Sequence, residues 1–321
     1  MGDVFVIVEQ RDGVVAPVSF EVLGAGAALA SSLGTRCVAV VAGGDDAASL
    51  APQLGAAAQV VSIADGRLAS YSPEAYKAAI GEVLAGRDAR LVLLGNTTVG
   101  IDLGAGLSAA LGVPLVAYAT DLSAEGATVV ATSRLYGGKA DVDIAIDGAA
   151  VVTVQAGAFP ADAGRVSGSP ELEEVKAPAA LEGVRTRFLE LIEPQGGDVD
   201  ITRQDILVSV GRGIQNADNL EVVQELADAL GGALSASRPV TDNGWLPKTR
   251  QVGKSGLAVK PKLYLCAGIS GAPEHLEGMR DAELIIAINT DEKAPIFDVA
   301  HYGITADLFD VVPALTEKLK G

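Results

Sequence analysis

The sequence predicts an α/β protein with two mostly parallel sheets, and three observations support this fold class. First, 49% of the 321 residues are apolar but only 4% are aromatic, so aliphatic residues supply the core, as in parallel strands covered by helices. Second, apolar strand-like segments alternate with helix-like segments through the first half of the chain, which indicates right-handed crossovers. Third, an apolar segment at residues 262–267 runs directly into a glycine turn and a helix start.

The first half of the chain supplies the larger of the two predicted sheets. Strands are expected at Val4–Glu9, Cys37–Ala42, Val60–Ile63, Leu91–Leu94 and Val151–Val154. Helices are expected between them, at Ser19–Leu33, Ala47–Leu54, Pro73–Leu84 and Ile101–Leu111. Residues 115–147 break this rhythm, and the β-rich stretches Thr128–Thr132 and Val142–Ile146 predict antiparallel strands appended to the sheet.

A boundary near residue 200 is expected to divide the chain into domains 1–200 and 201–321. Residues 158–178 lose periodicity and fill with Pro, Gly, Ser and acidic residues, which predicts a loop, and a further strand is expected at Arg185–Ile192. The second domain is expected to contain strands and helices in the order Ile206–Val210 (strand), Asn219–Leu230 (helix), Ala233–Ser237, Lys262–Ala267 and Leu284–Ile288 (strands), and Pro313–Leu319 (helix).

Composition excludes several classes of protein. The net charge of −17 argues against nucleic-acid binding, which needs a positive surface. No apolar run approaches the roughly 20 residues of a membrane helix, and no basic leader precedes the first strand. Cys37 and Cys266 lie in predicted strands, where a thiol serves as a small hydrophobe, and two histidines with two separated cysteines do not make a metal site. We therefore expect a cytoplasmic protein, or one of the mitochondrial matrix in a eukaryote.

Glycine turns mark the candidate ligand sites. Gly268-Ile-Ser-Gly271 is the strongest, because a strand precedes it and a helix follows, so that backbone N–H groups face an anion. Gly211-Arg-Gly213 also follows a strand, and Arg212 there would either contact a phosphate or be solvated. Gly95–Gly100 would mark a nucleotide crevice in the first domain, although no Lys-Ser/Thr follows, so it is no P-loop. Gly24-Ala-Gly26 and Gly104-Ala-Gly106 lie inside predicted helices and indicate close helix packing.

The charge and histidine content near the glycine turn leave two interpretations open. Residues 238–262 contain six basic residues and a single acidic one, Asp242. This excess indicates either a solvated loop or a positive electrostatic field for an anionic ligand. His275 follows the turn in the first helical turn, where a neutral ring facing the ligand is favoured over an imidazolium, although a lone histidine is more often structural. His301 has no role that spacing assigns.

Ordered motifs connect these features. In the second domain they are VGRG near residue 210, SR before a short loop and a Trp, QVG-x-SG, LY-x-CAGISGA-x-x-H, AIN-x-D-x-x-APIF and YG-x-x-ADLF-x-VVP; the first domain has SRLYGGKA (133–140) and VVTVQAGAFP (151–160). This series resembles the electron-transfer flavoprotein α-subunit family, closely over the second domain and more loosely over the first. The resemblance implies an adenine-nucleotide α-hydrolase-like parallel sheet domain, followed by a doubly wound FAD-binding domain.

The resemblance also implies roles for individual residues. Arg238 would lie over the isoalloxazine near N1 and C2=O, where a guanidinium favours the negative charge of the reduced ring, and Ser255 would lie near N5. His275 would hydrogen-bond near C2=O. The remaining implied contacts are Gln251, Val252 and Gly253 at the ring edge, Lys254 beside them, Ser270, Gly271, Ala272, Pro273, Glu274 and Asn289 along the phosphate and ribitol side, Asp307 and Leu308 at the adenosine, and Arg212 and Ser237 completing the set.

Three positions depart from the family pattern. Lys254 stands where the family often has Gln, and it would raise the flavin potential if it pointed inward but be merely solvated if it pointed outward. His301 replaces a common acidic residue, and Gln155 stands where Arg is frequent. These departures leave FAD binding intact but leave partner class and redox tuning open.

The implied function is that of an electron carrier with no substrate, and no catalytic residue, of its own. FAD would accept electrons from an acyl-CoA-type or other flavin dehydrogenase and pass them to a quinone reductase or other acceptor, in a heterodimer with a β subunit. NADH would be the donor if the complex bifurcates electrons. A nucleotide-sensing module without redox activity is the main alternative, and a nicotinamide-binding transhydrogenase-like domain is a weaker one.

Overall fold

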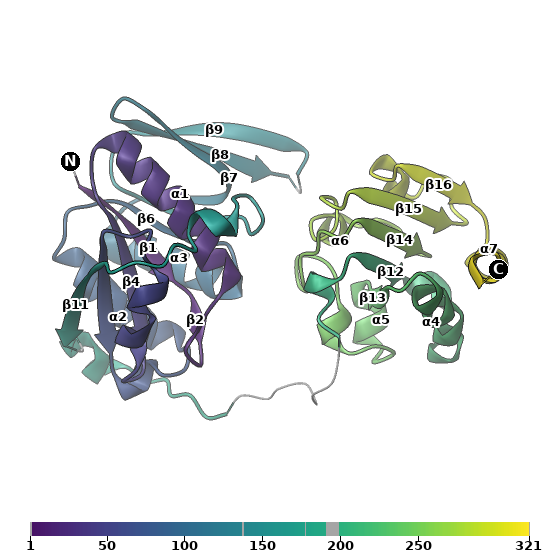
Figure 1. The fold of residues 1–321 in the computed structure, drawn as a ribbon, viewed down its shortest axis with the longest axis horizontal. Helices are drawn as coiled ribbons and strands as arrows, with labels where there is room; N and C mark the ends of the chain where they lie inside the picture. The colour runs from purple at the N-terminus through teal and green to yellow at the C-terminus, as the bar shows by residue number, and fades with distance from the viewer. Residues whose placement is uncertain (1, 137, 177, 191–198, 321) are drawn as a thin grey trace. The chain divides into compact units, whose positions relative to one another are not determined.

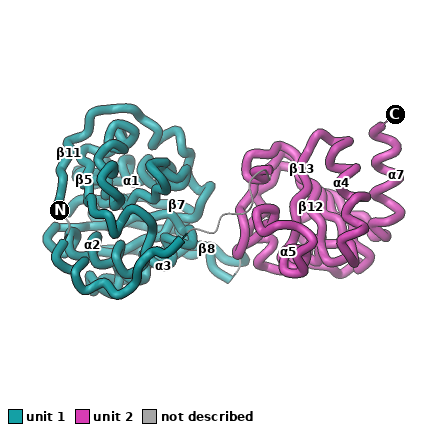
Figure 2. Tube along the Cα trace, turned by 90° about the horizontal axis from the view of Figure 1, so that it is seen from below, with its two compact units in different colours: residues 1–190 teal, residues 191–321 magenta. Residues whose placement is uncertain are grey.

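The protein is described by a computed structural model over residues 2–136, 138–176, 178–190 and 199–320. The chain divides into two units, residues 1–190 and 191–321, which Figure 2 colours separately. The boundary at residue 200 expected from the sequence lies close to this division. Each unit has its own sheet and its own buried clusters.

The first unit is built on a nine-stranded sheet in the order β11-β5-β4-β1-β6-β10-β7-β8-β9 (Figure 1). Its strands are β1 (Asp3–Val8), β4 (Cys37–Gly43), β5 (Gln59–Ala64), β6 (Ala89–Gly95), β7 (Leu115–Glu125), β8 (Thr128–Leu135), β9 (Ala140–Ile146), β10 (Ala150–Val154) and β11 (Glu171–Lys176). Strands from β11 to β7 pair in parallel, whereas β7, β8 and β9 pair antiparallel. The predicted parallel strands and the appended antiparallel ones are confirmed.

Helices cover both faces of this sheet. They are α1 (Pro17–Leu33), α2 (Pro73–Ala85) and α3 (Thr98–Leu111), joined by the short pair β2 (Gln10–Arg11) and β3 (Val14–Val15) and the 3₁₀ helices η1 (Ala47–Gln53), η2 (Gly66–Leu68), η3 (Ala161–Ala163) and η4 (Ala179–Gly183). Because side chains alternate along β1, Val4 and Val6 pack with α1 while Phe5 and Ile7 pack with α2 and α3. The helix predicted over 47–54 forms as the 3₁₀ helix η1, which contains Pro52 and ends at Gln53.

The glycines inside α1 and α3 allow close packing, as predicted. A side chain on Gly26 would meet Val6 Cγ2 at 2.7 Å, and one on Gly104 would meet Thr153 Cγ2 at 2.9 Å. The Gly95–Gly100 turn begins α3, where Thr97 Oγ1 accepts a hydrogen bond from Gly100 N–H at 3.0 Å and donates one to Glu9 Oε2 at 2.6 Å. These bonds give the turn a structural role, and a nucleotide crevice there stays a prediction.

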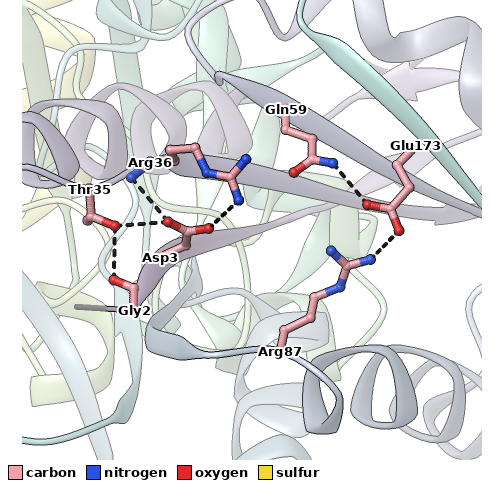
Figure 3. Close-up of polar contacts among 7 residues, drawn as sticks. All are labelled: Gly2, Asp3, Thr35, Arg36, Gln59, Arg87 and Glu173. Carbon is pink, nitrogen blue, oxygen red and sulfur yellow. Dashed lines mark hydrogen bonds and ion pairs between the residues drawn. The ribbon is translucent and has the colours of Figure 1, made fainter.

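The loop predicted over residues 158–178 is wrong in part, because Glu171–Lys176 form the edge strand β11. Glu173 on β11 accepts hydrogen bonds from Gln59 Nε2 at 2.9 Å and from Arg87 Nη2 at 2.5 Å (Figure 3). The strand predicted at 185–192 is also wrong over its described part: residues 184–190 form no regular structure, and 191–192 lie outside the described residues. The N–H groups of Arg185 and Thr186 donate instead to Glu74, at 3.0 and 2.9 Å.

The second unit is a parallel five-stranded sheet in the order β13-β12-β14-β15-β16 (Figure 1). Its elements are β12 (Ile206–Val210), β13 (Ala233–Ala236), β14 (Leu263–Ala267), β15 (Leu284–Asn289), β16 (Tyr302–Thr305), α4 (Leu220–Ala229), α5 (Arg238–Asp242), α6 (Pro273–Leu276), α7 (Leu308–Lys320) and the 3₁₀ helices η5 (Ile201–Arg203), η6 (Arg212–Ile214), η7 (Ala217–Asn219), η8 (Lys248–Arg250) and η9 (Pro295–Asp298). Helices α4 and α7 pack with Val208 and Leu265 on one face, while Leu207, Tyr264 and Met279 pack on the other. The sheet is therefore doubly wound, and the predicted α/β class is confirmed.

The last helix begins earlier than predicted. Pro313 was expected at its first turn, yet α7 starts at Leu308 and includes that proline. The Asp307 carboxylate accepts a hydrogen bond from Phe309 N–H at 3.0 Å and so supplies the start signal instead. This start brings Leu308 to the carboxyl end of β16.

The strand order places a switch point at β12. From β12 the chain moves to β13 on one side and then to β14 on the other, so the loops after β12 and β14 diverge at the carboxyl edge. Doubly wound sheets bind ligands in the crevice at such a point. We therefore expect the functional site of this unit at the carboxyl ends of its strands.

Candidate functional site

A cleft of about 820 Å³ opens at the carboxyl ends of all five strands of the second unit. Arg212 follows β12, Ser237 follows β13, Ser270 follows β14, Asn289 ends β15 and Asp307 follows β16. Each strand thus delivers at least one polar side chain to the same edge, which is where the switch-point rule places a ligand. The size is that of a site for a large cofactor or a drug-sized ligand.

The glycine turn after β14 presents a row of unused backbone donors. Gly268 and Gly271 have φ of 67° and 84°, conformations that a side chain rarely adopts. Between and beside them, the backbone N–H groups of residues 269–272 donate no hydrogen bond to any described part of the chain. Consecutive free amides of this kind bind anions such as phosphate.

Two arginines lie at the cleft with different surroundings. The guanidinium of Arg212 forms no ion pair with any described residue and is exposed. Arg238, in the first turn of α5, donates from Nε to Asp242 Oδ2 at 3.0 Å, and both side chains are more than half exposed. Because no described carboxylate pairs with it, Arg212 is more available than Arg238 to bind an anionic ligand.

His275 is buried beside the turn and held by a polar network. Its Nε2 lies 3.0 Å from the hydroxyl of Tyr264, which donates to Ser209 Oγ at 2.7 Å. Its Nδ1 is buried and forms no hydrogen bond of normal geometry with the described residues. Burial lowers the pKa of His275 to about 4, and the Val252 backbone opposes this shift only in part, so the ring is neutral at physiological pH.

Ser255 is held in the cleft by a residue behind it. Gln251 is buried, its Nε2 donates to Ser255 Oγ at 2.9 Å, and its Oε1 accepts from Thr241 Oγ1 at 2.7 Å. The neighbouring Lys254 N–H donates to Glu274 O at 2.7 Å, which packs this segment against α6. The Lys254 side chain is about half exposed and its Nζ lies 3.9 Å from Glu277 Oε2, so it does not line the cleft.

Most residues predicted for the site line this one cleft. They are Arg212, Ser237, Arg238, Val252, Gly253, Ser255, Ser270, Ala272, Glu274, His275, Asn289, Asp307 and Leu308. Gln251, Lys254, Gly271 and Pro273 belong to the same segments but do not line it. Gly213, Gly268 and Ile269, which belong to the two predicted glycine turns, also line it, whereas sequence reasoning missed Gln215, Pro239, Ile288, Thr290, Asp291, Ala294 and Ala306. Most of these adjoin a predicted residue or a strand end, which is the signal that would have found them.

A smaller hollow of about 260 Å³ lies at the amino ends of strands of the first unit. Its two arginines are engaged: Arg36 Nη2 lies 2.8 Å from Asp3 Oδ2, and Arg87 Nη2 lies 2.5 Å from Glu173 Oε1 (Figure 3). Because each guanidinium already has a carboxylate partner, this hollow is a weaker candidate than the cleft for binding an anion.

Comparison with known proteins gives matches over both units. The family model described as the electron transfer flavoprotein FAD-binding domain matches residues 200–280, and the electron transfer flavoprotein domain matches residues 4–180. Protein FixB of Clostridium saccharobutylicum is 35% identical over 99% of this chain and 96% of its own length. Electron transfer flavoprotein subunit alpha is 35% identical in Bacillus subtilis (99% of this chain, 97% of that protein) and 36% in Methylophilus methylotrophus (99% of both).

None of the described helices combines the length and the apolar character needed to cross a bilayer.

Proposed function

The chain belongs to the electron-transfer flavoprotein α-subunit family, and we propose from this premise that the cleft of its second unit holds the flavin ring near Arg238 and the adenosine near Leu308. FAD is the cofactor, because the matched domain is the FAD-binding domain of these proteins. The function is that of an electron-transfer flavoprotein, and an α subunit implies a heterodimer with a β subunit. The comparisons give no support to a nucleotide-sensing module without redox activity.

The residues of the cleft fit FAD on three counts. The free N–H groups of residues 269–272 and the unpaired Arg212 complement a pyrophosphate. The buried Nδ1 of His275 has no protein partner of normal geometry among the described residues, so a ligand atom would satisfy it. The cleft volume of about 820 Å³ is large enough to bury most of an extended cofactor.

The observation that carries the assignment is the row of free amides beside the glycine turn. A pyrophosphate carries about two negative charges, and Asp291, Asp307 and Glu274 also line the cleft. Carboxylates alone would repel such a ligand, so the amides and Arg212 must hold its phosphates. Ser270, Ala272 and Asn289 lie at the same strand ends and would contact the phosphates and ribitol.

At the other end, residues near α5 and α6 would surround the isoalloxazine. When bound, FAD supplies chemistry that takes up and releases electrons singly or in pairs. Arg238 would favour the negative charge gained on reduction, Ser255 would hydrogen-bond the ring near N5, and His275 would contact it near C2=O. Val252 and Gly253 would line the ring edge, with Gln251 fixing Ser255 from behind.

We further propose the classes of electron donor and electron acceptor for this carrier. Electrons would arrive from an acyl-CoA-type or other flavin dehydrogenase, or from NADH in a bifurcating complex, and leave to a quinone reductase or other acceptor. The relatives named above are bacterial, and we propose a cytoplasmic location for the heterodimer.

Coexpression with the β subunit tests the proposed function. The purified heterodimer should be yellow, and denaturation should release FAD at one equivalent for the α chain beyond any nucleotide held by β. The control is the β subunit purified alone. A heterodimer without releasable FAD in excess of that control would contradict the proposal.

A further inference from the structure

Gln215 adopts a strained backbone conformation at the cleft. It has φ 73° and ψ −48°, and it is the one residue other than glycine with a positive φ in the described part of the second unit. Asn216 N–H donates to Ile214 O at 2.9 Å across it, which closes a tight γ-turn. Gamma-turns with a positive central φ are rare and strained.

Hydrogen bonds and the burial of Ile214 hold the turn in place. Ile214 is fully buried, its N–H donates to Gly211 O at 3.1 Å, and its carbonyl also accepts from Asn219 Nδ2 at 2.9 Å. Gly213 N–H donates to Gly268 O at 3.2 Å, which ties the loop after β12 to the glycine turn. The conformation of Gln215 is therefore set by its surroundings and is not that of a loose loop.

A glycine would occupy this position without strain, yet the chain has a long polar side chain there. A residue in such a region costs about 1–3 kcal/mol, and strained residues cluster at ligand sites. Gln215 lines the cleft, and its side chain has no hydrogen-bond partner among the described residues. The side chain is thus free to contact a ligand in the cleft.

We propose that Gln215 is a binding residue for the adenosine half of the ligand, which rests on the proposed function for the identity of that ligand. A side chain on Gly268 would meet Gly213 Cα at 2.9 Å and Leu308 Cδ2 at 2.9 Å, so the Gln215 turn borders the Leu308 end of the cleft. The carboxamide offers a donor and an acceptor together, the pattern that pairs with the N6 and N7 edge of adenine.

Two substitutions separate the side chain from the strain. Gln215→Ala removes the carboxamide and keeps the strained backbone, while Gln215→Gly removes both. We expect both variants of the full heterodimer to bind FAD and ADP about tenfold more weakly, as for the loss of one or two hydrogen bonds, with FMN affinity unchanged. In the ligand-free state, Gln215→Gly should melt at a higher temperature than Gln215→Ala, because only glycine relieves the strain.

Asp12→Gly is the matched control. Asp12 has φ 51° in the turn between β2 and β3 of the first unit, so glycine relieves strain there without touching the cleft. It should leave FAD, ADP and FMN affinities unchanged. Equal FAD affinity for wild type and both Gln215 variants would overturn the inference, as would an equal loss of FMN and FAD binding. If the wild type bound no FAD, the proposed function itself would fail.

Discussion

The imidazole of His275 and the phenol of Tyr264 meet at 3.0 Å, and both side chains are buried at the edge of the cleft. Tyr264 is fully buried and donates onward to Ser209 Oγ, so the network runs from the cleft into the sheet. Since burial raises the pKa of Tyr264 well above its ordinary value and lowers that of His275, both groups are neutral near pH 7. One nitrogen of His275 is thus bound to Tyr264, and the other forms no hydrogen bond of normal geometry with the described residues.

This burial predicts an acid-sensitive second unit. The pKa of His275 falls from 6.5 to about 4 on folding, so between these values the unfolded chain binds more protons than the native one. Stability is therefore fully present above pH 6.5 and declines by up to about 3 kcal/mol as pH falls toward 4. We expect His275→Gln to flatten this decline, measured by urea unfolding with the fluorescence of Trp245, the single tryptophan.

His301→Gln is the control for that experiment, because its ring is exposed and accepts a hydrogen bond from Ile285 N–H at 2.9 Å outside the cleft. The control should retain the wild-type pH dependence. A decline of equal size in His275→Gln and wild type would show that another group causes it.

Arg238 and Lys254 should affect the flavin potential to different degrees. Arg238 lines the cleft, so Arg238→Ala should lower the potential for the first electron, because the cation that we propose lies beside the ring is lost. Lys254 Nζ lies toward Glu277 and outside the cleft, so Lys254→Gln should shift the potential much less. Redox titration of the FAD-loaded heterodimer measures both, and a larger shift for Lys254→Gln would refute this placement.

Gly271 should be intolerant of any side chain. A Cβ there would lie 2.3 Å from Ile296 N, in addition to the strain of φ 84°. We expect Gly271→Ala to lower the unfolding free energy by about 3 kcal/mol or more. Gly231→Ala, with φ 67° and nothing within 4 Å, carries the backbone strain alone and should lose about 1 kcal/mol. Equal losses would mean that the turn can shift away from Ile296.

Arg212 should contribute to FAD affinity but not to the free energy of unfolding. Its guanidinium is exposed and has no ion pair with a described residue, so Arg212→Gln should leave the unfolding free energy unchanged while weakening FAD binding about tenfold. Lys262→Gln removes an equal charge from the same unit, where Lys262 pairs with Asp205 at 2.9 Å, and should not alter affinity. Titration at two salt concentrations checks the comparison, since the Arg212 contribution should shrink as salt rises. Similar affinities for both variants would remove Arg212 from the phosphate site.

Local patterns predicted most of the fold because they act within one segment. The aliphatic strands β1, β4, β6 and β14 are buried on both faces, and such runs are visible in the sequence alone. The Gly268 turn was found because strand, glycine and helix start adjoin one another. Cys37 and Cys266, expected as small hydrophobes, are buried free thiols in β4 and β14.

What escaped prediction depends on partners distant in the chain. The acidic sequence of β11 is typical of a loop, and the strand is stabilised by the hydrogen bonds of Glu173 to Gln59 and Arg87, which the sequence does not reveal. The direction of Lys254 depends on Glu277, a residue of the next structural segment. Gln215 gives no signal in the sequence, since its strain comes from hydrogen bonds that form only in the folded loop.

Histidine NMR tests the central claim, that FAD lies in the cleft of the second unit, most directly. The chain has two histidines, of which His275 lines the cleft and His301 does not. An α chain labelled with ¹⁵N-histidine and paired with unlabelled β subunit should give two sets of ring signals, assigned with His301→Gln. Adding FAD to the ligand-free heterodimer should shift the His275 signals in proportion to FAD bound and leave those of His301 in place. Stoichiometric FAD binding with unchanged His275 signals would contradict the account.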